Sequence, residues 1–174
     1  MFSRRIAAVA ASVLLLTLGL GCYQTKTPLG SAASATVDRA YVGDFVMPGE
    51  NKPAVVIRNL DDKQYFVEYT ESKDDREPMR MVGYTAKVNG ATFANLRGLT
   101  DNGSIDDQFL IMRVSLSPDH AKLSLRELKE EFFKGKNVSS SRALRNVIEA
   151  NLDNDLMYEG QAHIFTRKLP ATQP

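Results

Sequence analysis

Residues 79–98 read MRMVGYTAKVNGATFANLRG, and they contain the most informative local pattern in the chain. Two runs that can form strands flank Asn89-Gly90, the dipeptide that most readily takes the positive φ angles of a two-residue β-hairpin turn. We therefore predict strands at Met79–Val88 and Thr92–Leu96. A tight turn should join them as an antiparallel pair.

A period of two recurs on both sides of this hairpin. Inward and outward positions alternate over residues 64–69 and again over residues 109–116, as expected of strands with one buried face. Four further runs have strand composition, namely Tyr41–Met47, Ala54–Asn59, His120–Leu123 and Gln161–Arg167. The sequence thus predicts eight strands.

Turn residues separate most of these runs. The expected reversals are Pro48-Gly49, Asp61-Asp62, Asn102-Gly103 and Ser117-Pro118-Asp119. Glycine, proline, asparagine and aspartate favour such reversals because they adopt or preset the required backbone angles. Consecutive strands joined by short turns predict an antiparallel meander.

Two short helices are expected before the last strand. The first should begin at Ser124, which has capping-box spacing to Glu127. The second should begin after Ser139-Ser140-Ser141. Its apolar stripe consists of Leu144, Val147, Ile148 and Leu152.

Seven strands, a helical crossover and an eighth strand predict a small antiparallel barrel or half-barrel, with the last strand beside the first. Gly43-Asp44-Phe45 stands near the start of the first strand. It resembles the Gly-x-Trp element of lipocalin-like barrels, with Phe in place of Trp, and in those barrels a helix also precedes the final strand. The resemblance implies a mainly β, lipocalin-like architecture and no specific family.

The first 21 residues have the pattern of an export signal. Arg4 and Arg5 precede an acid-free, mostly apolar run over residues 6–20. A secretory apolar region needs about 7 to 15 residues and ends at small residues, whereas a membrane-spanning helix needs about 20. We predict a signal peptide over residues 1–21.

Leu18-Gly19-Leu20-Gly21-Cys22 follows, and it resembles the lipobox of bacterial lipoproteins. That family usually has leucine three positions before the cysteine, where this chain has Gly19. The resemblance implies that Cys22 is acylated and anchors the protein in a membrane. Since Tyr23 follows rather than aspartate, it also implies an outer-membrane protein facing the periplasm. A soluble secreted protein cleaved near Gly21 and an uncleaved signal anchor remain the alternatives.

The domain organisation follows from these patterns. We expect the lipidated cysteine and a flexible tether over residues 22–38, a single β-rich domain over residues 39–169 and a tail over residues 170–174. The signal peptide holds two arginines and no acid, so the remaining chain has 20 basic and 21 acidic residues, a formal net charge of −1. This balance argues against nucleic acid as a partner.

No catalytic or metal-binding motif stands out. The chain has two histidines, His120 and His163, and they form no metal-binding spacing. Ser104 lacks the Gly-x-Ser-x-Gly pattern of a nucleophile elbow. We therefore predict no catalytic residue, no metal and no cofactor.

Five residues are candidates for lining a ligand cavity. Tyr65, Val67 and Tyr69 share one face of a predicted strand, and Met79 and Met81 lie on the next strand. They point either into the barrel or outward. Flexible methionines and amphipathic aromatic side chains suit an apolar ligand, but they also suit a packed core.

Three function classes remain open. The favoured one is a membrane-anchored, non-catalytic interaction module that holds an envelope protein, and the alternative is a carrier or sensor of an apolar ligand. An enzyme is the third. An interior cavity of about 300 Å³ or more, lined by one parity of each strand, favours the carrier. A filled interior favours the interaction module.

Overall fold

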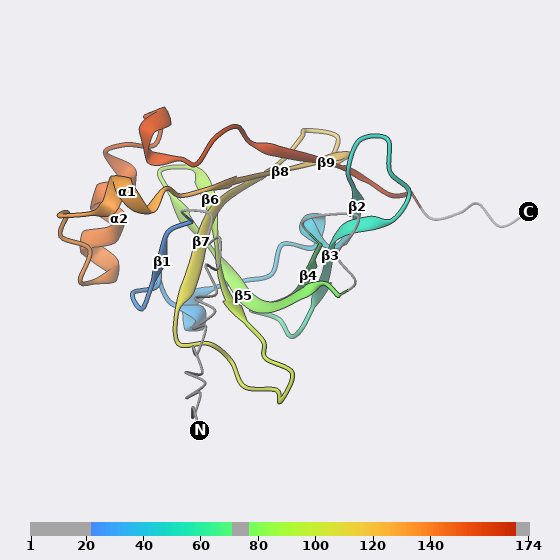
Figure 1. The fold of residues 1–174 in the computed structure, drawn as a ribbon, viewed down its shortest axis with the longest axis horizontal. Helices are drawn as coiled ribbons and strands as arrows, with labels where there is room; N and C mark the ends of the chain where they lie inside the picture. Colours follow the sequence, from blue (N-terminus) through green and yellow to red (C-terminus); the bar gives the residue numbers. More distant parts are fainter. Residues whose placement is uncertain (1–21, 71–76, 170–174) are drawn as a thin grey trace, which may run out of the picture.

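The computed structural model describes residues 22–70 and 77–169. The expected signal peptide and the C-terminal tail lie outside the described residues. In the described part of the chain, eight strands close into an antiparallel barrel in the order β2-β3-β4-β5-β6-β7-β8-β9, with β9 paired to β2. A further strand, β1, pairs with β7 (Figure 1). The prediction of a mainly β, antiparallel barrel is confirmed.

The bounds of the strands lie within two residues of the expected ones, except that β8 ends at Glu127, four residues beyond the expected end at Leu123. The barrel strands are β2 Gly43–Val46, β3 Pro53–Asn59, β4 Tyr65–Tyr69, β5 Met79–Val88, β6 Ala91–Gly98, β7 Phe109–Leu116, β8 Lys122–Glu127 and β9 His163–Arg167. The remaining elements are β1 Gln24–Thr25, α1 Glu130–Phe133, α2 Ser141–Glu149 and the 3₁₀ turns η1 Ala32–Ser34, η2 Arg39–Tyr41 and η3 Asp155–Met157. His120 has a φ of 56°, so it belongs to the turn and β8 begins after it.

The hairpin at Asn89-Gly90 is confirmed. Asn89 and Gly90 have φ angles of 45° and 82°, and Val88 pairs with Ala91 across the turn. Positive φ at both central residues is the geometry that matches the right-handed twist of the flanking strands. From this turn the register of β5 and β6 runs without a break to Met81 and Gly98.

The two helices before the last strand are present, but the expected start of the first was wrong. Ser124 lies in β8, where it pairs with Ser115 of β7 and Ile164 of β9. Pairing on both sides closes the barrel and satisfies more backbone groups than a capping box would. The helix α1 begins only at Glu130.

The start of α2 agrees with the prediction. It is capped by Ser140, whose side chain accepts a hydrogen bond from the backbone N–H of Ala143. This bond satisfies one of the N–H groups that the first turn of a helix leaves without an intrahelical partner.

Two hydrophobic cores lie on opposite faces of the barrel wall. One is inside the barrel and includes Phe45, Leu123 and Phe165. The other is outside it, where Phe93 and Ile111 of the wall pack with residues that include those of α1 and α2. Figure 1 shows α1 and α2 together on one side of the barrel, with β3 and β4 on the other.

The segment over residues 22–38 is packed against the barrel, which differs from the flexible tether expected. Leu29 is fully buried. Its backbone N–H donates to Oδ1 of the buried Asn95 at 2.6 Å, and its carbonyl accepts from Nδ2 at 3.2 Å. Ser141 of α2 donates to the Pro28 carbonyl at 2.6 Å. Single apolar residues in a polar stretch carry no period, so the sequence did not reveal this docking.

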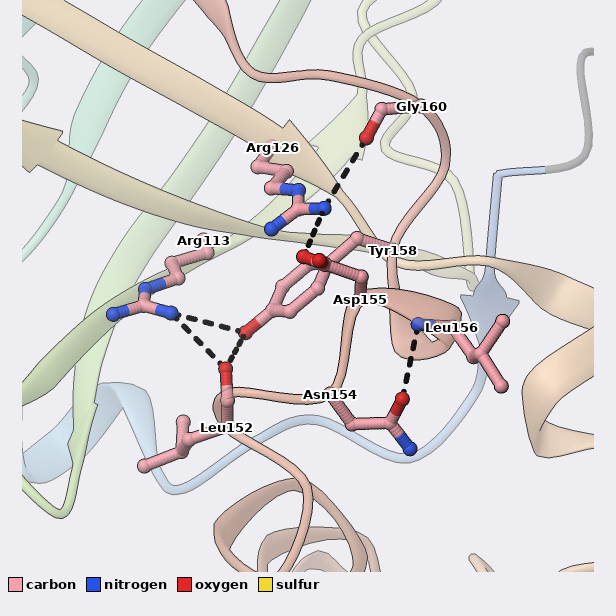
Figure 2. A network of polar contacts seen from close by, with 8 residues as sticks. All are labelled: Arg113, Arg126, Leu152, Asn154, Asp155, Leu156, Tyr158 and Gly160. Carbon is pink, nitrogen blue, oxygen red and sulfur yellow. Dashed lines mark hydrogen bonds and ion pairs between the residues drawn. The ribbon is translucent and has the colours of Figure 1, made fainter.

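A polar network fastens the segment after α2 to the outer face of the barrel. Figure 2 shows Arg126 of β8 lying across the ring of Tyr158, with its guanidinium carbon 4.2 Å from the ring centroid. The same guanidinium pairs with Asp155 at 2.9 Å. Arg113 of β7 donates to the Leu152 carbonyl at 3.1 Å and to the Tyr158 hydroxyl at 3.3 Å. These contacts set the path of the chain into β9.

Candidate ligand cavity

The barrel encloses a cavity of about 260 Å³. Each strand that lines it contributes residues of one parity, with Tyr84 as the exception. The apolar lining side chains are Val55, Ile57, Val67, Met79, Met81, Ala94, Leu96, Leu110, Met112, Val114, Leu123 and Leu125. This lining follows from the period of two, because alternate side chains of a strand point to the same face.

All five ligand-lining candidates border this cavity. Tyr65, Val67 and Met81 are buried deep in it, Tyr69 is partly buried, and Met79 is 52% exposed. The pairing of β4 with β5 places Val67 opposite Met81 and Tyr69 opposite Met79. These five side chains therefore face the barrel interior and not its outer surface. Their role toward a ligand stays a prediction.

One end of the barrel is closed by the chain that leads into β2. This closed end is where β3, β5 and β7 finish and β2, β4, β6 and β8 begin. The Tyr65 hydroxyl accepts from the Asp38 backbone N–H at 2.6 Å and donates to the Asp38 carbonyl at 3.2 Å. Val37, Tyr41 and Val42 pack against the interior core here. Burial raises the pKa of both Tyr65 and Tyr41, so both phenols stay neutral at ordinary pH.

The opposite end, the open end, carries the polar part of the lining. Cys22, Gln24, Glu127 and His163 all border the cavity there, and Gln24 and His163 are exposed. The Cys22 thiol donates to Oε2 of Glu127 at 2.6 Å. The backbone of Cys22 pairs with that of Lys129, and this pairing brings the side chains of Cys22 and Glu127 together. The cavity thus has an apolar body and a polar rim.

Sequence reasoning missed this polar rim. It assigned Glu127 to a helix cap and placed Cys22 and Gln24 in or beside a tether, while His163 was placed correctly in the last strand. The alternation of Leu123, Leu125 and Glu127 is the signal that could have placed Glu127 on the inner face of a strand.

The side chains at the rim can form hydrogen bonds. Among residues 22–70 and 77–169, no three His, Cys, Asp or Glu side chains come together as a metal site. Within the same ranges, none of the helices has the length and apolar character needed to cross a bilayer. The amide of Gln24, the carboxylate of Glu127 and the imidazole of His163 beside an apolar cavity suit the polar group of an otherwise apolar ligand.

The described residues form a small closed antiparallel β-barrel with an apolar cavity inside it. Comparison of the chain with protein-family models, with curated proteins and with solved structures finds no match. The cavity and its surroundings are therefore the features of this protein that bear on its function.

Proposed function

We propose that this protein is a membrane-anchored bacterial envelope lipoprotein whose barrel carries or senses a small apolar ligand, without catalysing a reaction. The observation that supports this most directly is the cavity, with its apolar body and one-parity lining. Its volume of about 260 Å³ is below the value of about 300 Å³ that favours the carrier, so the proposal rests on the apolar, one-parity lining and not on the volume. The ligand is accordingly small, such as a single acyl chain or a compact ring system.

The energetics of an empty cavity also support a ligand. If the cavity held only water, its apolar lining would stay hydrated and would lose the free energy of burial, about 25 cal/mol per Å². Natural domains have only about 5–15 kcal/mol of stability in total. A ligand that fills the space recovers much of this loss. An interaction module that needs no ligand would gain stability from larger lining side chains.

The lining itself is suited to an adaptable apolar fit. Met79 and Met81 of β5 and Met112 of β7 border the cavity. Methionine has three rotatable bonds and a polarisable sulfur, so it adjusts to ligands of different shape. The side chains of Tyr41 and Tyr65 block the closed end of the barrel, so the ligand enters and leaves at the open end.

A titration with the fluorescent fatty acid parinaric acid tests this proposal. The protein should enhance the probe's fluorescence saturably. Replacing Ala94, which lines the cavity, by leucine should weaken binding by about tenfold or more, a loss of about 1.4 kcal/mol. The matched control is Lys122→Leu, an exposed position of β8, and it should bind like the wild type.

The opposite results would support the interaction module. If the folded wild type leaves the probe unbound, or if Ala94→Leu binds as well as Lys122→Leu, the cavity is not a ligand site. Native mass spectrometry of the purified protein gives an independent reading. A co-purifying lipid that Ala94→Leu loses would support the carrier.

A further inference from the structure

Cys22 is the first residue that the structure describes. Cys22 borders the cavity at the open end. It is held there by its backbone bridge to Lys129 and by the next residue, Tyr23, whose N–H donates to the Leu128 carbonyl at 2.8 Å. The Tyr23 ring is buried and stacks on Phe133 with centroids 4.2 Å apart. Cys22 is therefore part of the barrel rim and is not at the end of a loose tether.

The second observation concerns the 21 residues that precede Cys22. They lie outside the described structure, and they contain the apolar run over residues 6–20. Two membrane-inserting elements are consistent with this sequence: a lipid on Cys22, or the apolar run itself if it is retained. Both would leave the barrel from Cys22, so both would hold the open end close to the bilayer.

The third observation is the distribution of exposed apolar side chains. Met79 and Ile105, which are 52% and 45% exposed, lie at the start of β5 and in the β6–β7 connection, at the open end. Leu60 and Leu169, which are 53% and 77% exposed, follow β3 and β9 at the closed end. Both ends thus expose apolar side chains, so the orientation rests on the position of Cys22, and a bilayer at the open end would cover Met79 and Ile105.

From these observations we infer that the open end of the barrel lies against the lipid bilayer and exchanges its ligand directly with it. The bilayer covers the apolar side chains of the rim and supplies the apolar molecule that fills the cavity. The orientation follows from the position of Cys22 and of the rim. The exchange step rests on the proposed function.

Tryptophan quenching tests the orientation, because the chain contains no tryptophan. Met79→Trp places the only tryptophan at the open end, and Leu60→Trp is the matched control. Leu60 is 53% exposed, close to the 52% of Met79, and follows β3 at the closed end. Both variants of the full chain are reconstituted into vesicles of phosphatidylethanolamine and phosphatidylglycerol with brominated acyl chains.

Contact with brominated chains quenches tryptophan. We expect a several-fold larger loss of emission for Met79→Trp than for Leu60→Trp. Equal loss, or a larger loss for Leu60→Trp, would overturn the orientation. Ile105→Trp at the same end provides a second reading should Met79→Trp fail to fold, and the same two outcomes apply to it.

Transfer of parinaric acid from vesicles to the anchored protein tests the exchange step. Direct exchange predicts a transfer rate that rises with vesicle concentration, whereas release through water predicts a rate that does not. The second result would overturn direct exchange. Strong quenching of Met79→Trp, together with a wild-type protein that does not bind the probe, would reject the proposed function and the exchange step and leave the orientation standing. If the wild type binds the probe but the two tryptophan variants are quenched equally, the orientation would be rejected and the proposed function would stand.

Discussion

The guanidinium carbon of Arg167 lies 4.6 Å from the centroid of the Phe45 ring. Arg167 is the last residue of β9, and Phe45 is fully buried in β2. The same side chain donates to the carbonyls of Val42 at 2.6 Å and His120 at 2.8 Å. One residue thus joins the last strand, the first barrel strand and the turn before β8. A Cβ atom on Gly43 would collide with this guanidinium.

Replacing Arg167 by methionine should destabilise the barrel by about 2–4 kcal/mol. The substitution keeps much of the apolar stem but leaves backbone carbonyls at the closed end without their donor, and each such loss costs about 1–3 kcal/mol. Urea denaturation measures the change. The control is Arg58→Met, where a surface guanidinium 48% exposed pairs with Asp44, and it should cost less than about 1 kcal/mol. Equal effects of the two substitutions would contradict the role assigned to Arg167.

The β5–β6 turn should not tolerate a β-branched residue. Gly90→Val forces valine to a φ near 82°, which should cost about 1–3 kcal/mol. Asn89→Gly is the control, because glycine adopts the same positive φ without strain. Thermal unfolding of both variants gives the comparison. An unchanged melting temperature for Gly90→Val would refute the turn geometry.

Asn95 should hold the N-terminal segment on the barrel. Asn95→Leu removes the hydrogen-bond partners of the Leu29 N–H and carbonyl. Each of these buried groups, once unpaired, should lower the stability of the docked segment by about 1–3 kcal/mol. We expect trypsin to cut after the exposed Lys26 several-fold faster, because the segment spends more time undocked. Asn59→Leu, at an exposed position of β3, should leave this rate unchanged. Similar cleavage rates in the two variants would contradict the docking role.

The anchor prediction follows from the lipobox resemblance of residues 18–22. Cys22→Ser should leave the barrel folded and move the protein from the membrane fraction to the soluble fraction, or stall it as an unprocessed precursor. Cell fractionation and mass spectrometry read out both results. Ser34→Ala, an exposed change in the same segment, should fractionate like the wild type. A Cys22→Ser protein that is processed and stays in the membrane would rule out lipidation at this residue.

Stability should fall at alkaline pH. Burial raises the pKa of Tyr65 and Tyr41 above the ordinary value of 10.0. Once the pH passes the unfolded value, the folded state retains protons that the unfolded chain loses, so the free energy of unfolding decreases as pH rises. Urea midpoints at pH about 9 and about 11 measure this fall, and Tyr65→Phe should make it smaller. A fall of the same size in Tyr65→Phe would mean that Tyr65 does not contribute to it.

Features with a local cause could be read from the sequence. The strands follow from alternating side chains, the β5–β6 hairpin from Asn89-Gly90, and α2 from its serine cap and apolar stripe. In each case residues within a few positions of one another carry the physical preference. For Tyr65 and Met81 the sequence left two directions open, into the barrel or outward. It could not decide between them, because the two faces of a strand look alike until the sheet curls.

The remaining features depend on partners distant in the sequence. Ser124 has a local helix signal, yet β7 and β9 offer it pairing on both sides, and barrel closure outweighs the cap. Leu29 is docked by Asn95, 66 positions away, and Cys22 meets Glu127, 105 positions away. Such contacts form only once the barrel has closed. The cavity likewise exists because side chains from many strands leave its centre unfilled, a property of their joint packing that no single stretch of sequence encodes.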